Sequence, residues 1–154
     1  MGIFLHRDMS FWVLNSDRAI APKKGTAKSA GWDLYAEEDF ILRHDDGNVV
    51  VKLSVAIAPG AMDGAYMRIA PRSGNAVKHV TVDAGVVDED FVNSIGVVMR
   101  CVKPGHAVEF KRGDRIAQCI FTALHDPEAA YAAALARGAG APAEKHEGFG
   151  STGQ

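Results

Sequence analysis

Glycine and proline interrupt the first 120 residues at short intervals, and the runs between them are short and rich in β-branched residues. The clearest run is Val49–Ile57, in which apolar side chains alternate with small or polar ones, as in a strand with one buried face. We predict further strands at Ala65–Ala70, Ile95–Val102, Ala107–Phe110 and Arg115–Phe121. Residues 45–48 and 103–105 are typical of turns. Many short strands with few helical patterns predict an all-β sandwich or barrel.

The character of the sequence changes after His125. Residues 126–137 read DPEAAYAAALAR, which favours a helix but would equally suit a loosely held connector. The last stretch, Glu147–Gly153, reads EGFGSTG, and so many glycines cannot pack a core by themselves. We therefore expect a β domain over residues 1–125, followed over residues 126–154 by a connector and a flexible arm whose tip has a function.

Composition excludes several classes of protein. The 154 residues are 47% hydrophobic and 23% charged, which is ordinary for a soluble globular protein. The net charge of −2 provides no global positive field for a nucleic-acid backbone, so we expect no nucleic-acid partner. The apolar stretches are too short to span a bilayer, and the N-terminal residues lack the pattern of a secretory signal. We expect no membrane association and a cytoplasmic or nuclear location.

The cysteines and histidines do not predict a structural site. Two cysteines, Cys101 and Cys119, make no disulfide framework, so we expect reduced and buried thiols. None of the six histidines lies three to five residues from another or near a pair of cysteines, as the ligands of a structural zinc site usually do.

Four polar segments that contain glycine interrupt or end the predicted strands. They read AGWDLYA (30–36), APRSGNA (70–76), KRGDRIAQ (111–118) and GFGSTG (148–153). In the second and fourth, backbone N–H groups freed by glycine stand next to hydroxyl groups, and Arg72 adds a guanidinium. A phosphate chain needs such donors, although neither segment fits a standard phosphate-binding loop. Taken singly, each segment is more often a turn than a site.

A fifth segment, DAGVVDEDF over Asp83–Phe91, carries three consecutive carboxylates that begin at Asp88. The simpler interpretation is a solvated turn. The functional interpretation is one carboxylate that takes a proton from water, with the others near a metal. Because two valines lead directly into Asp88, we expect this carboxylate where the edge of a strand becomes partly dry.

In this order and spacing, the five segments resemble the five motifs of the trimeric deoxyuridine triphosphate nucleotidohydrolases, the dUTPases. The resemblance runs from about residue 29 to 153. It implies a jelly-roll-like β-barrel, assembled as a homotrimer whose active sites are shared between subunits. It also implies hydrolysis of dUTP to dUMP and pyrophosphate, which clears dUTP from the nucleotide pool and supplies dUMP. Water would attack the α-phosphorus in line, with Mg²⁺ held mainly by the triphosphate.

The resemblance further implies roles for the residues around the phosphates. Asp88 matches the catalytic carboxylate, which orients and deprotonates the attacking water. Asp33 matches an acid that reaches the magnesium waters, or the arginine of the phosphate loop, from the second layer of contacts. The matching phosphate contacts are Arg72, Ser73, Gly74 and Gln118.

For the nucleoside, the resemblance implies a narrow β-hairpin that reads uracil and a ring that stacks on the deoxyribose. The ring is Phe91. The hairpin residues are Gly85, Val86, Val87 and Gly96. Phe149 matches the aromatic side chain that covers the uracil when the arm closes. The donors to the terminal phosphates match Gly150, Ser151 and Thr152.

The chain departs from the family pattern at several of these places. Phe91 replaces the usual tyrosine, which keeps the ring and removes the phenol's hydrogen bond. Asn75 stands where the family usually has leucine. Glu144 stands where an arginine usually reaches the γ-phosphate, and neighbouring Lys145 could replace it only as a point charge.

Two other functions remain open at this point. A deoxycytidine triphosphate deaminase would share the fold, but it needs a glutamate that acts on water at the base, and the matching acid here is Asp88. A dUTPase-like binding protein that has lost catalysis and signals through its surface would fit the altered fifth motif. The intact second, third and fourth motifs oppose it.

Overall fold

The computed structural model describes residues 11–139, and their regular secondary structure is mostly β-strand. The chain divides into two compact units, Met1–Leu124 and His125–Gln154. The described strands are β1 (Trp12–Leu14), β2 (Lys23–Lys24), β3 (Trp32–Tyr35), β4 (Phe40–Arg43), β5 (Val49–Lys52), β6 (Val55–Ile57), β7 (Ala65–Ala70), β8 (Val80–Ala84), β9 (Val86–Val87), β10 (Gly96–Cys101), β11 (Ala107–Phe110) and β12 (Arg115–Ala123). Three short helices are η1 (His44–Asp46), α1 (Ser73–Val77) and α2 (Pro127–Ala136). The expected all-β class is confirmed.

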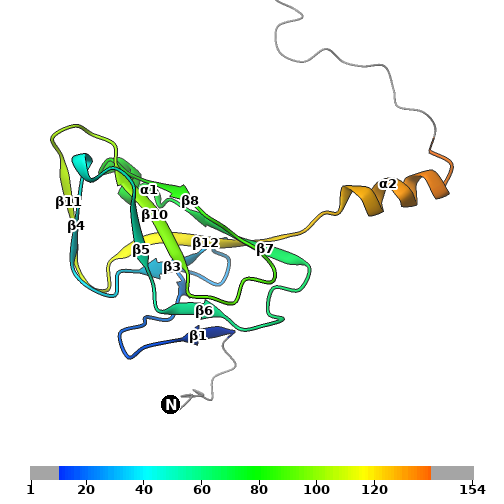
Figure 1. Ribbon diagram of the computed structural model, residues 1–154, viewed down its shortest axis with the longest axis horizontal. Coiled ribbons are helices and arrows are strands. Elements are labelled where there is room, and N and C mark those ends of the chain that lie inside the picture. Colours follow the sequence, from blue (N-terminus) through cyan, green and yellow to red (C-terminus); the bar gives the residue numbers. More distant parts are fainter. Residues whose placement is uncertain (1–10, 140–154) are drawn as a thin grey trace, which may run out of the picture. The chain divides into compact units, whose positions relative to one another are not determined.

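The strands of the first unit pair in four small sheets, all with antiparallel neighbours (Figure 1). The largest sheet has the order β2-β3-β12-β7-β9, and a second has the order β5-β10-β8. β1 pairs with β6, and β4 pairs with β11. The expected strands at Ala65–Ala70 and Ala107–Phe110 are found with the same bounds, and those at 95–102 and 115–121 differ by one or two residues.

The alternating run Val49–Ile57 is two strands, not one, and this corrects the expectation. β5 pairs with β10, whereas β6 pairs with β1, so the chain changes sheets at Leu53 and Ser54. Ser54 N–H donates to Glu37 Oε1 at 2.6 Å, and Ser54 C=O accepts from Asn15 N–H at 2.8 Å. Buried and more exposed side chains still alternate where the chain passes from one sheet to the other, because Leu53 is buried. The alternation alone therefore cannot show where the hydrogen-bonding partner of the backbone changes.

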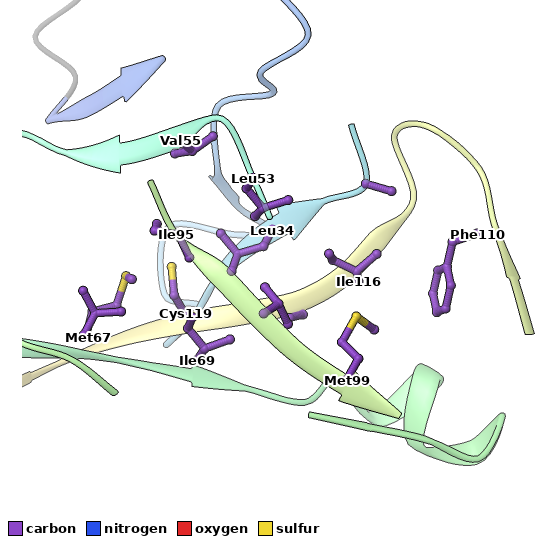
Figure 2. Packing of buried hydrophobic residues seen from close by; sticks show 14 of the residues in the cluster. Leu34, Leu53, Val55, Met67, Ile69, Ile95, Met99, Phe110, Ile116 and Cys119 are labelled. Atoms are coloured by element: carbon purple, nitrogen blue, oxygen red, sulfur yellow. The ribbon is translucent and has the colours of Figure 1, made fainter. Parts of the chain in front are cut away.

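One hydrophobic core connects the four sheets. β3, β7, β10 and β12 contribute side chains to one layer between them, which includes Leu34, Met67, Ile69, Met99 and Ile116 (Figure 2). The same cluster includes Trp12, Leu42, Val55 and Phe110 from the remaining sheets. Burial of this apolar surface is the main stabilising contribution that holds the sheets together.

Both cysteines are buried free thiols, as expected. Burial raises the pKa of Cys119 to about 12, so this thiol stays protonated and unreactive at neutral pH. Within the second unit, residues 127–136 form a helix rather than an irregular connector. Asp126 caps it by accepting from the N–H groups of Glu128 and Ala129, both at 3.0 Å, and Pro127 fills the first turn. Among the described residues, no helix is long and apolar enough to cross a membrane.

Candidate active site

Strand register brings three of the sequence segments together. Gln118 on β12 lies opposite Asp33 on β3 and, on its other side, opposite Ala70 at the end of β7. The chain leaves β7 through Pro71 and Arg72 and enters α1 at Ser73. Residues 30–36, 70–76 and 111–118 are far apart in sequence, and antiparallel pairing places them side by side.

Asp33 is the centre of the charges in this region. Its carboxylate is 13% exposed, and Oδ1 accepts a charge-assisted hydrogen bond from Arg72 Nε at 2.8 Å. The second oxygen, Oδ2, lies 3.8 Å from Nη1 of Arg115. Burial, together with the negative charge of Asp33, raises the pKa of Tyr35, which therefore stays a neutral phenol. Asp33 thus holds the guanidinium of Arg72 in a fixed orientation.

Gln118 is held in place by both neighbouring segments. Its Nε2 donates to the carbonyl oxygen of Pro71 at 2.9 Å. Gly31 leaves the space for this side chain, because a Cβ at position 31 would collide with Gln118 Oε1 and would lie 3.0 Å from Cδ. Gly31 is therefore a site residue that sequence reasoning did not single out, although it belongs to the quoted AGWDLYA segment.

These residues surround a polar cavity of about 240 Å³. Its lining residues are Gly25, Ser29, Gly31, Asp33, Arg72, Ser73, Arg115 and Gln118. Two guanidiniums, two hydroxyls and an amide around one hollow form a set of hydrogen-bond donors that suits phosphate oxygens. Gly25 and Ser29 belong to none of the five sequence motifs. They precede the AGWDLYA segment in a turn where Thr26 N–H donates to Ser29 Oγ at 2.9 Å.

The start of α1 supplies further donors beside Arg72. Within the helix, the N–H groups of Asn75 and Ala76 both donate to the carbonyl oxygen of Arg72 at 3.0 Å. The N–H groups of Ser73 and Gly74 precede these bonds, and the first N–H groups of any helix have no partner within it. A side chain at Gly74 would meet open space, so this part of the loop is accessible.

The remaining predicted site residues lie on a separate hairpin. β8 and β10 pair with each other, and their connection carries β9, which pairs with β7. Val86 is 65% exposed, Val87 is buried, and Phe91 is 37% exposed. Gly85 C=O accepts from Ile69 N–H at 2.9 Å. Gly96 opens β10, and a Cβ there would lie 3.4 Å from Val50.

Asp88 does not reach the polar cavity within one chain. It follows β9 in a turn where its carbonyl oxygen accepts from Phe91 N–H at 3.0 Å, and its side chain is exposed. The expectation that Asp88 lies in partly dry surroundings is therefore not met within a single chain. Within residues 11–139, no hydrogen bond or ion pair joins Asp88 to Asp33, Arg72 or Gln118.

Phe149, Gly150, Ser151 and Thr152 lie outside the described residues. The part of the chain from 11 to 139 contains no group of three or more histidine, cysteine or acidic side chains that could hold a metal ion. A larger hollow of about 520 Å³ between residues 37–41 and 46–54 contains none of the predicted site residues.

Comparison with known proteins supports the motif resemblance. A family model described as dUTPase matches residues 17–153. The mitochondrial deoxyuridine 5'-triphosphate nucleotidohydrolase of Homo sapiens is 42% identical over 143 residues, which cover 90% of this chain and 52% of that protein. This chain therefore spans about half the length of the human relative. The deoxyuridine 5'-triphosphate nucleotidohydrolase of Mus musculus is 40% identical over 147 residues, which cover 93% of this chain and 84% of that protein.

Solved structures give the same result for the fold. The dUTPase from phage phi11 of S. aureus superposes with a TM-score of 0.67 at 19% identity, covering 91% of this chain and 97% of its own. A mutant of that enzyme, at 18% identity and the same TM-score, is described as coordinating a structural Mg(II) ion. The five motifs, the family model over residues 17–153 and relatives at 40% identity and above agree, and the chain belongs to the dUTPase family.

Proposed function

We propose that this protein hydrolyses dUTP to dUMP and pyrophosphate. The observation that carries the proposal is the polar cavity in which Asp33, Arg72, Ser73 and Gln118 meet, because three motifs of a dUTPase sequence converge there on donors that suit phosphate. In this assignment the cavity receives the triphosphate, and the separate hairpin supplies the nucleoside contacts and the catalytic carboxylate.

Arg72 and Gln118 bind the phosphate chain. Asp33 occupies Nε of Arg72, so the two terminal nitrogens of that guanidinium are left to face phosphate oxygens. One N–H of the Gln118 amide donates to the carbonyl oxygen of Pro71, and the second N–H remains to donate to substrate. Ser73 adds its hydroxyl, and Ser73 and Gly74 add the free N–H groups at the start of α1. Negative charge that develops at the α-phosphorus is stabilised by donors already in place.

The hairpin residues select the nucleoside. The backbone of Gly85 and Gly96 reads the uracil edge between β8 and β10, with Val86 and Val87 forming the wall between them. Phe91 stacks on the sugar and leaves no room for a 2′-hydroxyl. Phe149, Gly150, Ser151 and Thr152 close over the bound nucleotide from the C-terminal arm.

Asp88 acts on water at a site completed by other subunits. An exposed carboxylate that the fold keeps away from the phosphate cavity of its own chain can serve the cavity of a second copy. A homotrimer with shared sites meets this requirement and would also make the surroundings of Asp88 drier. There Asp88 orients the attacking water and takes its proton.

The residues of the cavity are compatible with a magnesium ion that is held by the phosphates of the substrate. Asp33 already faces two guanidiniums, so it would be a poor direct ligand and would reach a magnesium ion only through water. Mg²⁺ commonly keeps several waters and binds substrate phosphates, so the described residues need not enclose it. When bound, the ion offsets charge on the triphosphate. Arg72 and Gln118 then orient the phosphate chain for attack.

A pyrophosphate-release assay on dUTP, dCTP, dTTP and UTP tests this function. We expect rapid release from dUTP and little from the other three. Deamination of dCTP without pyrophosphate release would identify a deaminase. Tight binding of dUTP without any turnover would identify a binding protein. Either result would contradict the proposal.

Phe91 gives a prediction about the sugar. Replacing Phe91 by alanine removes the ring that excludes a 2′-hydroxyl, so we expect the ratio of kcat/KM for dUTP to that for UTP to fall by about tenfold or more. Steady-state kinetics with both nucleotides measure this ratio. Val92→Ala is the matched control, because Val92 is a neighbouring exposed apolar residue with no assigned role. An unchanged ratio in Phe91→Ala would remove the ring from the sugar site.

A further inference from the structure

Asn75 is the one buried polar side chain among residues 11–139, with 7% of its surface exposed. It lies in the middle of α1, directly after the phosphate-binding residues. Its Nδ2 donates to the carbonyl oxygen of Arg115 at 2.9 Å and to that of Ile116 at 3.1 Å. Both amide hydrogens are therefore used on two successive carbonyls of β12.

Those two carbonyls lie where the sheet is irregular. β12 pairs with β3 through Arg115 and again from Ala117, so Ile116 is an extra residue, as in a β-bulge. On the other side of β12, pairing with β7 begins only at Gln118, because the chain leaves β7 after Ala70. The amide of Asn75 therefore donates hydrogen bonds to carbonyls at a point where the pairing of β12 with its neighbouring strands is interrupted.

These bonds close a ring of contacts around the phosphate cavity. Asn75 N–H donates to the carbonyl oxygen of Arg72, whose side chain pairs with Asp33. Asp33 faces Arg115, and the carbonyl of Arg115 accepts from the Asn75 amide. A shift of α1 away from β12 would therefore displace Arg72 relative to Asp33.

We propose that Asn75 is a positioning residue for the phosphate loop, because its amide fastens α1 to the start of β12 and sets where Arg72 and Ser73 meet the triphosphate. This inference rests on the proposed function. Leucine, which is usual at this place in dUTPases, has no donor for the two carbonyls.

Asn75→Asp tests the role at nearly constant side-chain size. Above the pKa of the new carboxyl, a carboxylate faces two carbonyl oxygens, and repulsion pushes α1 away. When protonated, the same group can donate to one of them. At pH 8 we expect KM for dUTP to rise by about tenfold or more, and at pH 6 we expect this deficit relative to the parent protein to shrink by about threefold. Arg72, Arg115 and Asp33, the charged residues of this ring of contacts, are unchanged in the variant, so the ratio isolates the new group.

The stability of Asn75→Asp should follow the same direction. Burial against carbonyl oxygens raises the pKa of the new carboxyl in the folded state above its unfolded value of about 3.9. A group with a raised folded pKa stabilises less as pH rises, so the difference in Tm from the parent should widen from pH 5 to pH 8. Asn48→Asp makes the same chemical change on an exposed turn and should show neither effect.

Asn75→Ala removes the two hydrogen-bond donors without adding charge. This variant tests the same role if the aspartate variant does not fold. Assayed well below its Tm, it should raise KM for dUTP several-fold at all pH values, whereas a merely structural role would lower Tm and leave KM unchanged. A KM within twofold of the parent in Asn75→Ala, or a pH-independent ratio in Asn75→Asp, would overturn the inference. An inactive parent protein would instead show that the proposed function itself is wrong.

Discussion

Replacing Asp88 by asparagine should lower kcat for dUTP by about 10²- to 10⁴-fold, the usual size of the loss when a general base is removed. Asparagine keeps the shape of the side chain and can still hydrogen-bond to water, but it cannot take the proton. Asp88 is exposed in the single chain and its side chain supports no described element, so the fold should be unaffected. Affinity for a non-hydrolysable dUTP analogue should change little.

Two neighbouring acids help to define this result. Asp90→Asn makes the same change two residues away on an exposed side chain and should keep kcat within about threefold of the parent. Glu89 is less suitable, because its Oε1 accepts from Gly64 N–H at 2.7 Å and has a structural part. If Asp88→Asn stayed within threefold of the parent protein while Asp90→Asn did not, the base would be assigned to the wrong carboxylate.

Replacing Arg72 by alanine should lower kcat/KM for dUTP by about 10²- to 10³-fold. The change removes a phosphate donor and also leaves the largely buried carboxylate of Asp33 without its partner at 2.8 Å. Arg72→Lys should recover only part of the loss, because an ammonium cannot bind Asp33 and phosphate with the same fork. Steady-state kinetics measure both, and Arg18→Ala, which breaks an exposed ion pair, is the control.

Mixtures of the two inactive variants test whether the site is shared. If Asp88 of one subunit serves the cavity that contains Arg72 of another, mixed trimers regain some sites in which both residues are intact. Random assembly from equal amounts would restore about a quarter of the sites. Co-refolded Asp88→Asn and Arg72→Ala should then be far more active than either alone. If the mixture is only as active as the mean of the two separate variants, both residues belong to the site of the same chain.

Much of this protein can be predicted from local sequence. The bounds of β7 and β11 follow from short runs that mix β-branched or aromatic residues with others between turn signals, whereas the sequence left residues 126–137 open between a helix and a connector. These features depend on neighbours within a few residues, where side-chain periodicity and backbone preferences act directly. The five motifs likewise identified the family, because they are contiguous segments in a fixed order.

What sequence could not supply was the set of partners. The ion pair of Arg72 with Asp33 spans 39 residues, and the bonds of Asn75 span 40 and 41. In the sequence, Asn75 was only a departure from the family pattern. Its role depends on the bulge in β12, and no residue near Asn75 in the sequence indicates that bulge. The need for glycine at position 31 follows only from the tertiary structure, in which the side chain of Gln118 occupies the space of a Cβ.

By itself, the sequence determined the all-β class, the strand character of five segments and the family, because each is a property of contiguous residues. The tertiary structure decided that Val49–Ile57 changes sheets at Leu53, and that the motifs around Asp33 and Arg72 converge while Asp88 stays apart. The reason is physical: a strand's alternation fixes which side chains are buried, whereas its hydrogen-bonding partner is chosen by the whole chain when the core closes.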